Sequence, residues 1–144
     1  MAVYLHAINV SNGLKLWNIF LGFPNPTLQP CIDALGMHSG LLSDSAITAS
    51  SSANPTSFAP EVGRLHYLSS GSGTYGSWAA ASNNLYQWLQ ADLGNWTRVT
   101  GVATQGRQDS DQMVKSYSLS SGDGRFFEFL KTENGAKKVH YYCN

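Results

Sequence analysis

The sequence predicts an all-β domain, a sandwich or barrel of short strands, and two observations carry this prediction. From residue 31 onward, short segments with β-branched or alternating apolar residues recur, and turn residues separate them. Only 12 % of the 144 residues are charged, which suits strands and ordered polar loops, whereas exposed helix faces need Glu and Lys. Several short strands with turns between them are typical of a sandwich or barrel.

Three strands are predicted before residue 105. Residues 45–50 form a short segment with β-branched residues that runs into a turn-rich stretch. Gln87–Leu93 alternates, with Leu89 and Ala91 on one face. A helical stripe also fits this segment, but the β-rich residues that follow it favour a strand. Arg98–Thr104 has the pattern of a strand that is buried on both faces.

Two hairpins are predicted after residue 113. Asp123-Gly124 separates Val114–Ser120 from Arg125–Lys131, and Asn134-Gly135 separates the latter segment from Lys137–Tyr142. Asp-Gly and Asn-Gly pairs supply the positive φ angles that type I′ turns require.

The charge balance excludes one class of partner. Nine Lys plus Arg balance nine Asp plus Glu, so the formal net charge is 0. A general nucleic-acid binder needs excess cations to displace counterions from phosphates, so nucleic acid is not an expected partner. The sequence has no apolar run of about 18 residues, so no bilayer-spanning helix is expected.

Residues 1–30 are predicted to be separate from the domain formed by residues 31–144. They carry a single charge, Lys15, and their apolar run Leu14–Phe23 ends at Pro24-Asn25-Pro26. A secretory signal needs a basic segment before the apolar run and a small-residue cleavage site after it, and neither is evident here. A poorly ordered leader or the remnant of an upstream segment is therefore expected.

No catalytic residue and no cofactor is expected. Gly71–Gly76 matches the Gly-x-Gly-x-x-Gly string, but no convincing helix follows it, which favours a surface loop over a nucleotide site. The sequence contains no Gly-x-Ser-x-Gly elbow. The histidines are scattered and lack metal-binding spacing: His6, His38, His66 and His140.

Residues 107–112 are predicted to form an exposed polar loop. Asp109 and Asp111 supply fewer oxygen ligands than calcium requires, and the EF-hand spacing is absent, so no metal is expected. Arg and carboxamide side chains match the donors and acceptors of hydroxyl-rich ligands. The loop is therefore a place for a recognition surface.

The two cysteines, Cys31 and Cys143, leave two interpretations open. A disulfide would close a long loop and contribute about 4–5 kcal/mol in the entropic treatment. Two free thiols in a reducing compartment are the alternative. No Cys-x-x-Cys pair is present, which disfavours a zinc or redox site.

Two triplets have the sequence of N-glycosylation acceptors, although such triplets also arise by chance. They are Asn95-Trp96-Thr97 and Asn9-Val10-Ser11. A third triplet, Asn54-Pro55-Thr56, is disqualified by its proline.

Several separated motifs occur in one order along the chain. The first are Cys31–Met37 and Ser43–Ser51, and those that follow are Arg64-Leu65, Trp78, Gln87–Gly94, Val99–Gly106 and Ser116–Leu119. Together they resemble the discoidin family, also called coagulation factor 5/8 type C domains. The resemblance runs from residue 31 to about residue 144.

This resemblance implies a jelly-roll β-barrel of the galactose-binding-like type, built from two packed antiparallel sheets. It also implies extracellular recognition without catalysis. Family members bind carbohydrates, phospholipid head groups, collagen or other proteins through loops at one end of the barrel. Here two of those loops correspond to Asn54–Phe58 and Arg107–Met113.

The expected ligand contacts are Asn54, Thr56, Ser57, Phe58, Arg107, Gln108, Asp109, Asp111, Gln112 and Met113. The expected barrel-holding residues are Arg64, Trp78, Trp88, Asp92 and Gln105.

The composition of these loops favours a polar ligand. Burying Phe58 and Met113 in a membrane would contribute roughly 2 kcal/mol each, and Arg107 near anionic lipid about 1 more. Asp109 and Asp111 would oppose this attraction, and micromolar binding requires about 8 kcal/mol. A glycan or an extracellular protein is therefore the expected partner, with Phe58 as a stacking platform. A phospholipid-binding module is the alternative.

The chain departs from the family pattern at its C-terminal end. In the family the first cysteine pairs with a cysteine at the very end of the domain, after further strands. Here Lys138-Val139 resembles the strand before that final portion, and the sequence stops at Asn144. The closing strands are expected to be missing, so Cys31 lacks its family partner, and whether Cys143 can replace it stays open. A weakly stable fragment is expected, and a truncated remnant without binding activity is a further alternative.

Overall fold

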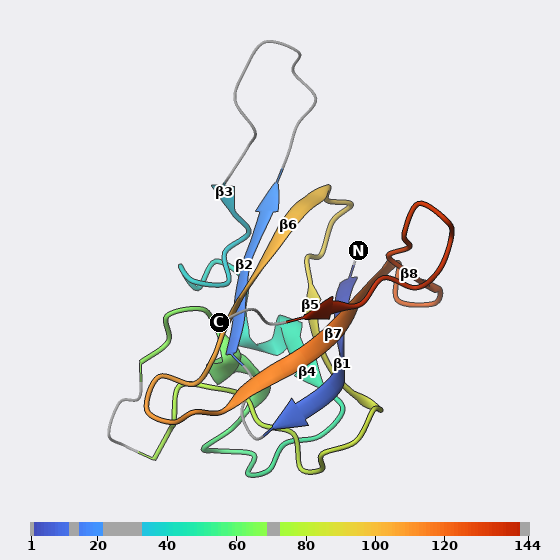
Figure 1. Ribbon diagram of the computed structural model, residues 1–144. Coiled ribbons are helices and arrows are strands. Elements are labelled where there is room, and N and C mark those ends of the chain that lie inside the picture. The colour runs from blue at the N-terminus through green and yellow to red at the C-terminus, as the bar shows by residue number, and fades with distance from the viewer. Residues whose placement is uncertain (1, 12–14, 22–32, 69–72, 142–144) are drawn as a thin grey trace.

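The protein is an antiparallel β-sandwich, as the sequence predicts. The computed structural model describes residues 2–11, 15–21, 33–68 and 73–141 (Figure 1). In these ranges the helical elements are two short 3-10 turns, η1 (Asp44–Ala46) and η2 (Pro60–Gly63). None of the described residues form a helix that is long and apolar enough to cross a membrane.

Two sheets make up the sandwich. The six-stranded sheet has the order β4-β5-β1-β7-β8, with β9 also paired to β7, and the three-stranded sheet has the order β3-β2-β6. The larger sheet consists of β1 (Ala2–Ser11), β4 (Ile47–Ala49), β5 (Gln87–Asp92), β7 (Met113–Gly122), β8 (Phe127–Phe129) and β9 (His140–Tyr141). The smaller sheet consists of β2 (Lys15–Leu21), β3 (Asp33–Ala34) and β6 (Val99–Gln105). Every pairing is antiparallel.

The three strands predicted before residue 105 are confirmed as β4, β5 and β6. Alternation in β5 places Leu89 and Ala91 in the core, where they are 1 % and 5 % exposed. The expectation that residues 98–104 are buried on both faces is wrong. The described side chains of β6 are half-buried, because β6 lies at the edge of the smaller sheet and pairs there with β2 alone.

The first predicted hairpin is confirmed, but its turn differs from type I′. β7 and β8 pair in register, with Gly122 opposite Phe127. Gly124 has φ +96°, whereas Asp123 does not take a positive φ. Instead the Asp123 carboxylate accepts hydrogen bonds from the backbone N–H groups of Arg125 and Phe126, at 2.9 and 3.0 Å. The same two bonds lower the pKa of Asp123.

The second predicted hairpin is mostly replaced by a different pairing. Lys131 and Lys137 form one isolated bridge around the turn at Gly135, which has φ +83°. The strand that follows, β9, pairs with β7 and not with β8. A turn signal fixes where the chain reverses, but the choice of partner strand depends on which edge is open.

The N-terminal residues differ from the poorly ordered leader that was expected. β1 lies between β5 and β7, with Ala2 opposite both Asp92 and Gly122, and β2 pairs with β6. The sequence Ala2–Ser11 contains no formal charge and is mostly apolar, which suits a strand that pairs inside a sheet. Residues 22–30 lie outside the described part of the chain.

The core lies between the two sheets. Its buried members are Met37, Ile47, Leu65, Trp78, Leu89, Ala91, Val114 and Tyr117. Val99 and Val102 of β6 pack against this cluster from the smaller sheet. The core therefore fixes the ends of the strands, and with them the loops that connect the strands.

Candidate functional site

One end of the sandwich brings together the two loops expected to contact a ligand. β4 ends at Ala49, which lies opposite Leu89 near the start of β5. β6 ends at Gln105 and β7 begins at Met113. As Figure 1 shows, the connection from β6 to β7 lies at the same end of the molecule as the connection that follows β4.

A guanidinium group and two aromatic rings meet where these loops come together. The rings of Phe58 and Tyr75 are stacked, with centroids 4.9 Å apart and planes 17° apart. The guanidinium carbon of Arg107 lies 4.5 Å from the Tyr75 centroid and 5.5 Å from the Phe58 centroid. These distances fall within the range of cation–π attraction, so the cluster ties three separate loop segments together.

The charge of Arg107 is balanced inside its own loop. Nε donates to Asp109 at 2.5 Å, and Nη1 donates to the Gln112 side chain at 2.8 Å. The backbone N–H of Arg107 also donates to the Gln112 carbonyl, at 2.9 Å. The side chain is only 13 % exposed. Arg107 therefore holds the loop in shape, and an anion would have to compete with Asp109 for it.

The loop after β4 is shaped by Asn54. Its side-chain oxygen accepts hydrogen bonds from the backbone N–H groups of Thr56 and Ser57, each at 2.9 Å. Its carbonyl accepts one from Phe58, and the Ser57 carbonyl accepts one from the N–H of Tyr75. An Asx turn of this kind is a common use of Asn in loops. It directs Phe58 onto Tyr75.

The structure separates the ten expected contact residues into three groups. Phe58, Arg107, Asp109 and Gln112 form or support the cluster. Asn54 and Ser57 shape the first loop, and Met113 is half-buried at the start of β7. Thr56, Gln108 and Asp111 are exposed around the cluster.

Tyr75 is a member of the cluster that was not among the expected contact residues. It follows the glycine-rich residues 71–74, which read only as a surface loop, and residues 69–72 lie outside the described part of the chain. Its ring is the most open part of the cluster, because Tyr75 is 42 % exposed whereas Phe58 is half-buried. An aromatic residue inside a glycine-rich loop was the available signal.

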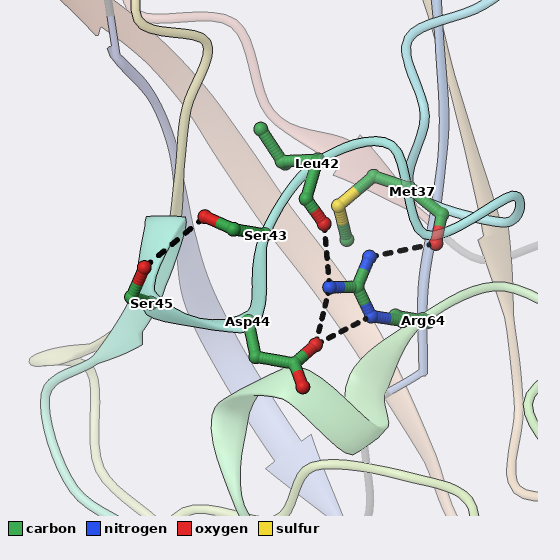
Figure 2. Close-up of polar contacts among 6 residues, drawn as sticks. All are labelled: Met37, Leu42, Ser43, Asp44, Ser45 and Arg64. Atoms are coloured by element: carbon green, nitrogen blue, oxygen red, sulfur yellow. Dashed lines mark hydrogen bonds and ion pairs between the residues drawn. The ribbon is translucent and has the colours of Figure 1, made fainter.

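Arg64 holds the segment from Met37 to Asp44 through two backbone carbonyls and one carboxylate (Figure 2). It is 6 % exposed, and its guanidinium donates to the Met37 carbonyl at 3.0 Å and to the Leu42 carbonyl at 2.7 Å. It also donates to the Asp44 carboxylate through Nε and Nη2, at 3.2 and 2.5 Å. The five donors of a guanidinium suit such a convergence of acceptors.

The other expected barrel-holding residues have different surroundings. Trp78 is fully buried, and its indole N–H donates to the Ser51 carbonyl at 2.9 Å. Trp88 is half-buried in β5. Asp92 is exposed and accepts a hydrogen bond from the Gly94 N–H. The Gln105 side chain accepts one at 3.1 Å from the N–H of His66, a residue with φ +57°.

The described residues contain no group of three or more His, Cys, Asp or Glu side chains that could hold a metal ion. Cys31 and Cys143 both lie outside the described residues.

Comparison with known proteins gives relatives over most of the chain. Rat lactadherin is 38 % identical over 144 residues, covering 95 % of this chain and 32 % of the relative. The human EGF-like repeat and discoidin I-like domain-containing protein 3 is 36 % identical over 125 residues, covering 81 % of this chain and 25 % of the relative. Human coagulation factor VIII is 35 % identical over 116 residues, covering 78 % of this chain and 5 % of the relative.

The extent of these matches bears on the N-terminal residues. A match over 95 % of the chain takes in most of residues 1–30, which were expected to be unrelated to the domain. The chain spans about a third of the length of the rat and mouse lactadherins. No solved structure matches it. The family model of the F5/8 type C domain matches residues 46–142, and the chain therefore belongs to the F5/8 type C, or discoidin, domain family.

Proposed function

We propose that the chain is a non-catalytic recognition module of an extracellular protein, which binds a polar ligand, a carbohydrate or a polar protein surface, through the loops around Arg107. The exposed ring of Tyr75, backed by Phe58 and Arg107, is the observation that carries this proposal. A sugar presents an apolar face of C–H groups and a rim of hydroxyl groups. An aromatic ring with polar neighbours complements both.

The surroundings of Tyr75 supply the polar part of such a site. Asp109 has a side chain that is 45 % exposed, and Gln108 and Asp111 are exposed beside it. Thr56 is exposed on the neighbouring loop. Carboxylate and carboxamide groups accept and donate the hydrogen bonds that sugar hydroxyls make. Tyr75 is 42 % exposed whereas Phe58 is half-buried, so Tyr75 takes the platform role that the sequence suggested for Phe58.

A phospholipid surface is the second candidate, and a different observation favours it. Leu85 and Tyr86 directly precede β5 at the same end of the sandwich, and they are 65 % and 83 % exposed. Burying both would contribute about 2 kcal/mol each, against the roughly 8 kcal/mol that micromolar binding requires. Phe58 and Met113 add little, because both are already half-buried.

A glycan array and vesicles of phosphatidylserine and phosphatidylcholine distinguish the two candidates. Each is probed with the wild-type chain, the Tyr75→Ala variant and the Tyr86→Ala variant. Tyr86 is the matched control, because it is an exposed tyrosine at the same end that no described contact connects to the Arg107 cluster. We expect glycan binding that Tyr75→Ala weakens at least about tenfold, which is about 1.4 kcal/mol, and that Tyr86→Ala leaves unchanged.

The opposite pattern would contradict the carbohydrate proposal. Vesicle binding that Tyr86→Ala abolishes and Tyr75→Ala preserves, with no glycan retained on the array, would establish the phospholipid candidate. Glycan binding that survives Tyr75→Ala would place the carbohydrate site elsewhere on the domain.

A further inference from the structure

Four Asn-x-Ser/Thr triplets occur in the chain, and acceptor chemistry and the structure distinguish among them. Asn25 and Asn54 are each followed by proline and are excluded by the chemistry of the acceptor. Asn9 lies within β1, where it pairs with Ser116 of β7. Asn95 lies in the connection between β5 and β6, and it is exposed. Only this last triplet combines an acceptor sequence with a surface turn.

The turn around Asn95 is compact and held by local hydrogen bonds. Gly94 has φ +70° and its N–H is held by the Asp92 carboxylate at 2.9 Å. The Asn95 N–H donates to the Leu93 carbonyl at 2.7 Å. The Thr97 hydroxyl donates to the Asn95 carbonyl at 3.0 Å, so both essential residues of the triplet share one turn.

We infer that Asn95 is a site of N-glycosylation. The inference rests on the extracellular location in the proposed function, because the donor is found along the secretory route. The side-chain nitrogen of Asn95 forms a bond to the anomeric carbon of an oligosaccharide carried on a lipid pyrophosphate. The bond from that carbon to the pyrophosphate oxygen breaks, the pyrophosphate leaves with the electron pair, and the amide nitrogen loses one proton.

The position of Asn95 is compatible with ligand binding at the other end. β5 has six residues and runs from the end that carries the Arg107 cluster to Asp92. At about 3.3 Å per residue the two ends are roughly 20 Å apart. Figure 1 shows the β5–β6 and β6–β7 connections at opposite ends of β6. A glycan at Asn95 therefore leaves the loops around Arg107 open.

The neighbouring side chain gives the glycan a local role. Trp96 is 81 % exposed, a large indole surface in water. A glycan attached to Asn95 can pack over the Trp96 ring. Exposed apolar surface favours contact with a partner that is held close to it. The glycan would then shield an aromatic residue that otherwise promotes self-association.

Cell-free translation in the presence of microsomes tests the inference. The full chain is fused to a heterologous cleavable signal sequence, and only protease-protected chains are scored, so location is supplied by the assay. We expect one glycosidase-sensitive glycan on the wild type. Asn95→Gln and Thr97→Val should each abolish it, and Asn9→Gln, the matched control, should retain it.

Two results would overturn the inference. One is a protected wild-type chain without a glycan. The other is a glycan that Asn9→Gln removes and Asn95→Gln leaves in place. Neither result bears on ligand binding, because the glycan array and the vesicle assay use the opposite end of the domain. The two proposals therefore fail separately.

Discussion

Replacing Arg64 by alanine should destabilise the fold by an amount that the structure allows us to work out. The substitution leaves the Met37 carbonyl buried without a donor, which costs about 1–3 kcal/mol, and the half-buried Leu42 carbonyl about 1 more. Loss of packing by the aliphatic stem adds about 1 kcal/mol. The Asp44 carboxylate is 72 % exposed and stays hydrated, so its lost ion pair contributes little. We expect a total of about 3–5 kcal/mol, a large part of the 5–15 kcal/mol that stabilises most domains.

Urea unfolding followed by tryptophan fluorescence measures this change, because Trp78 is fully buried in the folded state. Asp44→Asn is the matched control, since it keeps an acceptor for Arg64 and should cost about 1 kcal/mol or less. Arg64→Lys should fall between the two, because one ammonium group cannot reproduce the planar fork. A free energy of unfolding for Arg64→Ala within about 1 kcal/mol of wild type would refute the reasoning.

Three further changes have defined outcomes. Gly36→Ala should lower the free energy of unfolding by more than Gly40→Ala does. Both glycines have a positive φ, but only a Cβ at Gly36 would meet a neighbouring atom, the Leu41 Cβ at 2.8 Å. Equal losses in urea unfolding would contradict this. Burial raises the pKa of Tyr117 above its ordinary 10.0. The unfolded chain therefore loses this proton more readily, and the free energy of unfolding should fall as the pH rises above about 10. Tyr117→Phe should reduce that fall in unfolding curves recorded at a series of pH values. Deleting residues 1–14 should abolish cooperative unfolding, because β1 pairs on both sides, and a sharp transition in circular dichroism after the deletion would show that β1 is dispensable.

Local patterns were sufficient to predict the strands whose burial alternates. Leu89 and Ala91 mark the inner face of β5 because every second residue of a strand points the same way. The Asp123-Gly124 turn was located for a similar reason, since its constraint is local. β1 was not predicted, because its mostly apolar residues do not alternate and its pairing with β5 and β7 depends on residues far along the chain.

The candidate site was predictable in part. The resemblance to the discoidin family located the loops of Phe58 and Arg107, and the structure brings these two residues into contact. The sequence signal for Tyr75 was weak, an aromatic residue within a glycine-rich loop, because its stacking on Phe58 joins two loops and follows from no spacing. Arg64 was expected as a barrel-holding residue from the resemblance, but its acceptors at Met37 and Leu42 are backbone carbonyls that no side-chain pattern reveals.

The central place of β1 has a consequence for biosynthesis. Its ladder partners lie as far away as Gly122, so about 120 residues separate strands that must pair. At 5–20 residues per second a ribosome needs roughly 10 s to supply the second partner after the first strand is made. During that interval an uncharged, mostly apolar segment leaves the exit tunnel without its β7 partner. Nascent chains should therefore depend on chaperones that hold such segments, and synonymous codons that slow translation before β7 should lower the yield of folded protein.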